Sequence, residues 1–283
     1  MLAACTVLPV MDGIAKQLSE TLPVLQIVWA RYFFHLLLLS PVVFWRYGRQ
    51  TLVPQRPGLQ ALRSVFMLGS TTLFFFGISY MPIADTLALA FIGPFVVTAL
   101  SPLVLGEKVG PRRWIAVIVG FIGVLIVLRP GIGEWNWAAL AGLGAGIVHA
   151  FYFLTTRKLS GSAPPLVVLT YAAVVGAIVT SLALPFSWVT PTAGEMMLMA
   201  SIGLLAAVSH FMVMRSLDYA EATLIAPFSY SEIVMAVLVG LIWFGDFPDA
   251  LTWTGIAVII ASGVYISLRE RQLSRRQQAL PAA

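Results

Sequence analysis

Ten apolar stretches occupy nearly the whole chain, and short polar gaps separate them. A helix needs about 20 apolar residues to cross a bilayer. Most of the stretches approach or exceed that length, and Pro or Gly in the gaps ends each helix and turns the chain. The pattern predicts an all-α membrane protein with ten transmembrane helices. We expect them at Leu2–Ala15, Val24–Trp45, Leu62–Tyr80, Ile83–Leu105, Trp114–Leu128, Trp135–Thr155, Leu166–Trp188, Met196–Leu217, Thr223–Phe244 and Leu251–Leu268.

Basic residues fall almost entirely into alternate gaps between these stretches. The gaps after the second, fourth, sixth and eighth stretches, with the C-terminal tail, hold 14 of the 17 Lys and Arg. Arg63 belongs to the first of these gaps on this count. Positively charged loops stay in the cytoplasm, so the pattern predicts that both termini are cytoplasmic.

Composition agrees with a chain that lives in lipid. The 283 residues are 59% hydrophobic and 10% charged, whereas a soluble domain is about a quarter charged. The net charge of +5 is spread over short gaps, which predicts contact with anionic lipid headgroups and no nucleic-acid partner. Cys5 is the sole cysteine, so no intrachain disulfide or cysteine metal site is possible. We interpret the first residues as a retained helix and not as a signal peptide.

The chain repeats itself at an offset of about 137 to 141 residues. Gly106-Glu107-Lys108 is answered by Gly245-Asp246-Phe247, and Lys16-Gln17-Leu18-Ser19 by Arg157-Lys158-Leu159-Ser160. Each copy holds five helices, and because five is odd the copies must have opposite orientations. We therefore predict a first repeat over 1–130, a second, inverted repeat over 131–269, and a cytoplasmic tail over 270–283. Inverted repeats are the usual architecture for alternating access to a midplane site.

Gly106-Glu107-Lys108, the following Trp114 and the later Gly123-Val124-Leu125 resemble the EamA-type half-repeat of the drug/metabolite transporter superfamily. The resemblance implies a cavity lined mainly by helices 1, 3, 4, 6, 8 and 9, with helices 5 and 10 at the periphery. It also implies transport of small metabolites, often outward, in a bacterial inner membrane. Within the superfamily the chain is similar to bacterial amino-acid exporters, including the YddG-like exporters of aromatic amino acids. The second copy departs from the pattern, because Asp246 replaces Glu and has no basic follower, and this weakens any role for its loop.

Ionisable side chains are costly in hydrocarbon, so each one inside a helix is a candidate functional residue. Asp12 in the first helix and Arg31 in the second are expected in the outer half of the membrane, with His35 one turn from Arg31. An Asp12–Arg31 ion pair is expected there. The pair would either fix the packing of the two helices or open to bind the ammonium or carboxylate group of a substrate.

Three further ionisable residues are expected nearer the midplane or the inner half. Glu232 could be a proton site, an amine-binding site, or a protonated hydrogen-bond donor to a neighbouring helix. His149 and His210 are expected at matching depth, either as proton relays or as neutral hydrogen-bonded groups. The three histidines of the chain lack the spacing of metal ligands, so no metal site is predicted.

Large side chains on the expected cavity helices could form an apolar or aromatic wall, although most of them will pack against neighbours or lipid. The candidates for the cavity are Phe75, Tyr80, Phe91, Tyr152, Met214 and Tyr230. Pro94 and Pro227 lie at equivalent places inside the fourth and ninth helices. Because proline kinks a helix, the two are candidate hinges.

Sequence signals of an enzyme are missing. The chain has no phosphate-binding Gly-Lys-Ser/Thr loop, no His-Glu-x-x-His and no Gly-x-Ser-x-Gly, so ATP does not drive it directly and no cofactor is predicted. We predict a secondary carrier, monomeric or weakly dimeric, that exports neutral or aromatic amino acids. The alternatives are a carrier for another metabolite or drug class, a membrane-embedded lipid-modifying enzyme, a receptor or scaffold, and a passive channel.

Overall fold

A computed structural model describes residues 1–48, 55–107, 109–130, 136–159, 161–219 and 225–278. All regular structure in these ranges is helical. The first half contains α1 (Leu2–Leu18), α2 (Val24–Tyr47), α3 (Pro57–Tyr80), α4 (Ile83–Ala90), α5 (Gly93–Leu105) and α6 (Pro111–Leu128). The second half contains α7 (Trp137–Lys158), α8 (Pro165–Ala183), η2 (Leu184–Phe186), α9 (Ala193–Tyr219), η3 (Ala226–Tyr230), α11 (Ser231–Val239), η4 (Gly240–Phe244) and α12 (Ala250–Gln278).

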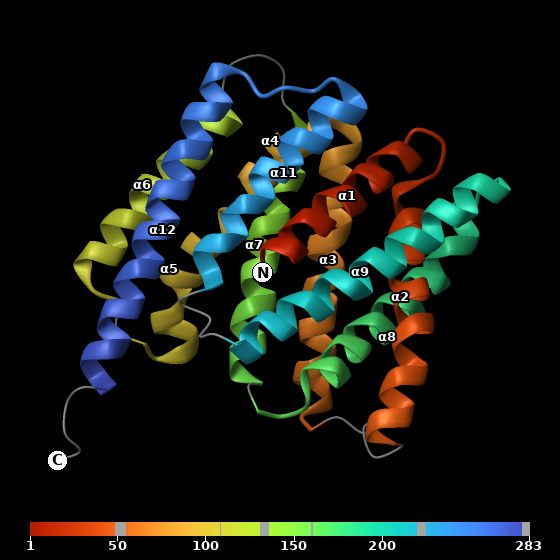
Figure 1. Ribbon diagram of the computed structural model, residues 1–283, viewed down its shortest axis with the longest axis horizontal. Coiled ribbons are helices and arrows are strands. Elements are labelled where there is room, and N and C mark those ends of the chain that lie inside the picture. Colours follow the sequence, from red (N-terminus) through yellow and green to blue (C-terminus); the bar gives the residue numbers. More distant parts are fainter. Residues whose placement is uncertain (49–54, 108, 131–135, 160, 220–224, 279–283) are drawn as a thin grey trace.

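Nine segments of the described chain are long and apolar enough to cross a membrane. The remaining long helix, α1, has 17 residues and is therefore about 25 Å long. Figure 1 places the C-terminal ends of α1, α3, α6, α8 and η4 at one end of the molecule, here called the upper end. It places the C-terminal ends of α2, α5, α7, α9 and α12 at the other, the lower end. The helix ends that border the gaps rich in Lys and Arg thus gather at the lower end, in agreement with the alternation of charge.

Helix contacts between the two halves come in matched pairs. Helix α3 packs on α7, and α1 packs on α9; likewise α4 packs on α7, and α11 on α1. Helices α6 and α12 pack on each other along one flank of the molecule (Figure 1). The fifth and tenth helices are therefore peripheral, as expected.

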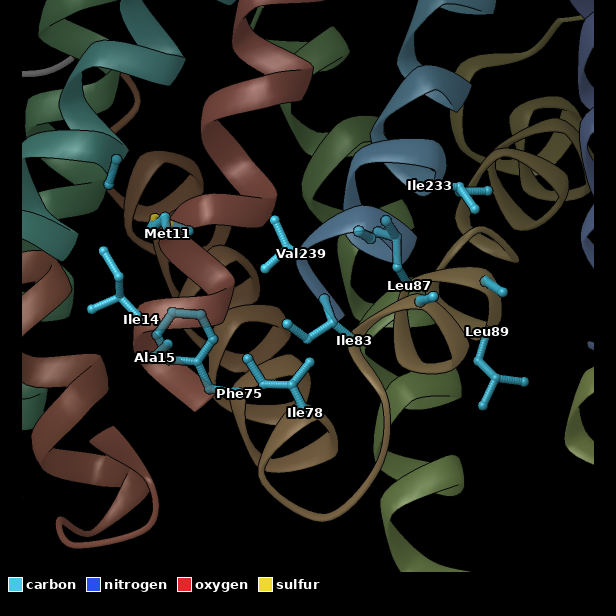
Figure 2. Packing of buried hydrophobic residues seen from close by; sticks show 14 of the residues in the cluster. Met11, Ile14, Ala15, Phe75, Ile78, Ile83, Leu87, Leu89, Ile233 and Val239 are labelled. Carbon is cyan, nitrogen blue, oxygen red and sulfur yellow. The ribbon is translucent and has the colours of Figure 1, made fainter. Parts of the chain in front are cut away.

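A buried apolar cluster joins the two halves at the centre of the bundle. In Figure 2 Met11, Ile14 and Ala15 of α1 approach Phe75 of α3, and Val239 of α11 lies beside them. Membrane helices gain little from the hydrophobic effect between themselves, so close packing of this kind holds them together.

Two of the expected helices are interrupted. The fourth breaks into α4 and α5 at Phe91 and Ile92, and Pro94 lies in the first turn of α5 instead of inside a continuous helix. In the ninth, Pro227 lies in the short 3₁₀ segment η3, followed by α11 and the π-helical turn η4. The part of that expected helix before Ile225 lies outside the described residues. A proline cannot donate a backbone hydrogen bond, which explains why each break adjoins one.

Gly146 permits the closest approach of α7 to the break after α4. A Cβ atom built on Gly146 would lie 2.3 Å from the carbonyl oxygen of Ala90 and 2.7 Å from Ile92. Gly144, half a turn away on the same helix, has room, since its Cβ would meet Leu73 at 3.4 Å. Small residues in membrane helices let backbones approach in this way.

We expect Gly146→Ala to lower the apparent Tm of the purified protein in detergent, because an added methyl group must displace backbone. Overpacking of this kind costs about 1–3 kcal/mol. Gly144→Ala is the matched control and should leave the Tm unchanged or slightly raised. Equal Tm values for the two variants would contradict the packing described here.

Candidate functional site

A small pocket lined by both polar and apolar side chains lies among α2, α3, α7, α8 and α9. Helix α2 contributes Arg31, Tyr32 and His35, and the other helices contribute Met67, Tyr152, Leu169, Ala172, Ala173 and His210. Its volume is about 10 Å³, roughly the room that one water molecule needs. The pocket therefore brings together the predicted site residues Arg31, His35, Tyr152 and His210. It also uses α2 and α8, which are the second and seventh membrane helices and are absent from the expected set of cavity helices.

Arg31 is the central charged group of this pocket, and its side chain is only 6% exposed. Its Nη1 donates to the hydroxyl of Thr71 at 2.5 Å and to that of Tyr32 at 3.3 Å. The two hydroxyls share a further hydrogen bond of 3.0 Å, and the guanidinium lies over the rings of Tyr32 and Phe75. Its Nε is buried and has no acceptor in the described part of the chain. A guanidinium so placed can still bind an anion, because its charge is not neutralised by these hydroxyls and its Nε has no described acceptor.

The histidines flank Arg31 but differ in their hydrogen bonds. His210 lies with Nδ1 2.7 Å from the carbonyl oxygen of Ala206, so Nδ1 carries the proton and Nε2 is an acceptor. The rings of His35 and His210 are 5.8 Å apart, and His35 Nε2 has no partner among the described residues. His149 lies 3.3 Å from the hydroxyl of Ser70, which donates to Ala145. His35 and His210 thus line the pocket, whereas His149 is held between α7 and α3.

Asp12 does not form the ion pair with Arg31 that the sequence analysis expects. Both residues are described, yet no ion pair joins them, and hydroxyl groups occupy Arg31 instead. Asp12 is 4% exposed and interacts electrostatically at longer range with Arg31 and with Glu232 of α11. The two carboxyl groups therefore lie near each other where α1 meets α11.

The aromatic and methionine candidates divide into three groups. Phe75 packs in the apolar cluster of Figure 2. Phe91, at the break after α4, stacks on Tyr230 of η3 with ring centroids 4.9 Å apart, so the interruptions of the two halves touch. Tyr80 is 73% exposed at the end of α3 and is not brought to the pocket, and Met214 is half-buried on α9.

Two residues of this region escaped the sequence analysis. Thr71 anchors Arg31, and Arg63, assigned to a cytoplasmic gap, is buried inside α3. Arg63, Met67, Thr71 and Phe75 are spaced by four residues, which places them along one face of a helix. That spacing could have indicated that Arg63 faces the interior with Met67 and Thr71. It was missed because Arg63 was counted among the basic residues of a cytoplasmic gap.

Lys16 and Arg157 form ion pairs at opposite ends of the molecule. Lys16, at the upper end of α1, lies 2.7 Å from Asp246 and donates to the carbonyl oxygen of Met81 at 3.1 Å. At the lower end, Arg157 of α7 lies 2.6 Å from Glu107. The Asp246 loop, to which the sequence comparison gave little role, therefore tethers α1. We call Lys16–Asp246 and Arg157–Glu107 the end ion pairs.

A third ion pair joins Arg129 to Asp249 where α6 ends and α12 begins. The Arg129 guanidinium donates a hydrogen bond that holds the pKa of the Asp249 carboxyl down at about 2. No group of three or more His, Cys, Asp or Glu in the described ranges could hold a metal ion.

Membrane-length helices packed around a small pocket that holds Arg31 and two histidines define an integral membrane protein. A family model described as the EamA-like transporter family matches residues 1–129 and 136–268. The chain belongs to this family.

Several characterised relatives are similar over nearly their whole length. The S-adenosylmethionine uptake transporter of Rickettsia bellii is 29% identical over 261 residues, covering 92% of this chain and 89% of its own. The riboflavin transporter of Vibrio cholerae is 29% identical over 286 residues, 98% of this chain and 95% of its own. The pseudopaline exporter of Pseudomonas aeruginosa is 28% identical over 265 residues, 91% of each. These names indicate transporters and not enzymes, and the resemblance to aromatic amino-acid exporters stays a prediction.

A crystal structure of another protein shares the fold. It matches with a TM-score of 0.67 and 16% sequence identity over 96% of this chain and 97% of that one.

We expect Thr71→Val to lower the apparent Tm, because Arg31 would lose its shortest hydrogen bond while its charge stays buried. A lost hydrogen bond to a charged group costs about 1–3 kcal/mol. Thr72→Val is the matched control, since the Thr72 hydroxyl donates only within its own helix, to Leu68. The anchoring role of Thr71 is wrong if both variants melt at the same temperature.

Proposed function

We propose that this chain is a secondary carrier for small metabolites that bear an amino-acid carboxylate and a planar ring, and that it works by alternating access. The observation that carries the substrate class is the buried Arg31, whose Nε has no acceptor and whose described partners are hydroxyls. A carboxylate would complete its hydrogen bonds and neutralise its charge.

Two neighbouring features suit the rest of such a substrate. Asp12 and Glu232 form no ion pair with a described residue, so they could receive an ammonium or another cationic group. The pocket and its surroundings are rich in rings, including Tyr32, Tyr152 and the stacked Phe91 and Tyr230. Rings favour stacking with a planar group.

S-adenosylmethionine carries a carboxylate, an ammonium, a cationic sulfur and a purine ring, and it fits this description as well as an aromatic amino acid does. The similarity to S-adenosylmethionine uptake transporters over more than 90% of the chain makes it the first substrate to test. Export, expected from the sequence, stays a prediction, because the relatives' names include an uptake transporter and an exporter. Riboflavin is the second candidate, favoured by the relative that covers 98% of the chain.

Alternating access is supported by the paired arrangement of the halves. The repeat pairs α1 with α7, α3 with α9, and the fourth membrane helix, which includes α4, with the ninth, which includes α11. Exchanging the halves therefore turns the α3–α7 contact into the α9–α1 contact, and the α4–α7 contact into the α11–α1 contact. The end ion pairs obey the same exchange, since the sequence repeat matches Lys16 with Arg157 and Asp246 with Glu107. The stacked breaks at Phe91 and Tyr230 are where each half could bend, as Pro94 and Pro227 suggest. Both end ion pairs are formed around a pocket with little free volume, which suits an occluded state of such a cycle.

The substrate class is tested by flux into liposomes that contain the purified protein. We expect saturable uptake of labelled S-adenosylmethionine or phenylalanine, with competition by free amino acids but not by their methyl esters. Arg31→Gln should raise the KM about 10- to 100-fold, the factor expected for one lost charge-assisted hydrogen bond. Arg31→Lys should have a smaller effect. Saturable riboflavin flux without any amino-acid flux would replace the first candidate with the second, and no saturable flux would reject the carrier.

Alternating access is tested by thiol labelling of Met67→Cys in a Cys5→Ser background with a membrane-impermeant reagent. Asp246→Asn should speed labelling from the upper end, and Glu107→Gln from the lower end, because each change weakens closure at one end only. Asp249→Asn is the matched control, since its ion pair lies on the peripheral α6–α12 flank. Faster labelling from the same end in both test variants would rule out opposed gates.

A further inference from the structure

Arg63 carries a buried charge that the proposed function does not yet use. Its side chain is 1% exposed, and its Nη2 donates to the carbonyl oxygen of Val168 on α8 at 2.6 Å. Its Nε and Nη1 are buried and have no acceptor in the described part of the chain. No ion pair with a described carboxylate neutralises it. Two donors of a permanently charged group thus have no acceptor among the described residues, which leaves them available to a ligand.

Arg63 is connected to the pocket through Tyr152. The Arg63 guanidinium lies 5.9 Å from the centre of the Tyr152 ring, and Tyr152 lines the pocket of Arg31. Arg63 also begins the face of α3 that continues through Met67 to Thr71. Because α3 starts at the lower end (Figure 1), Arg63 lies about 12 Å further toward that end than Thr71.

Among the described residues, the Oε1 of Gln60, close to Arg63, lacks a hydrogen-bond donor, whereas two nitrogens of Arg63 lack acceptors. Gln60, one turn earlier on α3, is buried, and its Oε1 has no hydrogen-bond donor among the described residues. Its Nε2 lies 3.3 Å from the hydroxyl of Ser162. A water molecule that accepted from Arg63 and donated to Gln60 would satisfy both groups and would make the cluster purely structural.

We infer that Arg63 is a second anion-binding subsite, on the lower side of the pocket, which takes the carboxylate of the substrate as it passes between Arg31 and the lower end. This inference rests on the proposed carrier function. A carboxylate fits because it neutralises the charge and accepts from Nε or Nη1 of the planar fork, whose N–H groups point to different sides of the guanidinium. The guanidinium is enclosed by α3, α7 and α8 and almost fully removed from the surface. A lipid phosphate outside the bundle therefore cannot reach it, whereas a substrate carboxylate reaches it from the pocket when the helices move apart during transport.

The test measures flux from each side separately, in vesicles of the two orientations, with the amino-acid substrate that the wild-type protein transports. Arg63→Gln should raise the KM about 10- to 100-fold for substrate presented at the lower end. It should leave the KM at the upper end within about twofold. Arg63→Lys keeps the charge but loses the fork, so its KM at the lower end should fall between those of wild type and Arg63→Gln. Arg46→Gln is the matched control, because it removes an exposed charge from the same end and should change neither KM.

The outcomes separate the inference from the proposal on which it rests. If the wild-type protein shows no saturable flux, the carrier function fails. If the wild-type protein transports and Arg63→Gln lowers the Tm with both KM values unchanged, Arg63 is structural and the subsite is overturned. Should Arg63→Gln not fold, Arg63→Lys decides alone: a KM raised only at the lower end supports the subsite, and equal KM values at both ends overturn it.

Discussion

Arg31 holds a positive charge inside a helix bundle that lipid surrounds, and its described hydrogen-bond partners are hydroxyls instead of carboxylates. An arginine at this depth costs about 2.5–3.5 kcal/mol by insertion scales. The bundle offsets that cost with the coupled hydroxyls of Thr71 and Tyr32 and with two aromatic faces. None of these groups neutralises the charge. A site of this kind is stable enough to persist and still has a free-energy gain available from an anion.

The same interaction shapes the surrounding helices. Thr71 ties α3 to α2, so the α3 face that carries Met67 and Arg63 is turned toward α7 and α8. Tyr152 then separates two guanidinium groups at different depths. Buried polar groups therefore lie at more than one depth along α3, at Arg63 and at Thr71.

The two halves meet through equivalent helix contacts, such as α3 on α7 and α9 on α1. Each end ion pair joins one half to the other, and each half has one helix break, after α4 and at η3. Interrupted helices in a membrane are tolerated where the freed backbone is buried in protein, and the stacked rings of Phe91 and Tyr230 bury both breaks at once.

The helical class and the order of the helices could be predicted from the sequence, because lipid demands long apolar helices. The alternation of charge also predicted which helix ends lie together, because cytoplasmic loops collect basic residues. The sequence also named Arg31, His35, Tyr152 and His210 as candidates, since polar groups in apolar helices stand out. The sequence could not show that Arg31 donates to Thr71 and forms no ion pair with Asp12. Position along a helix gives the depth of a side chain but not the direction in which it points around the helix axis. The sequence misplaced Arg63 because a charge near a helix end looks the same whether it faces water or the interior. Only the tertiary structure decided the partner of Arg31 and the burial of Arg63, because the neighbouring helices determine which face of each helix is enclosed.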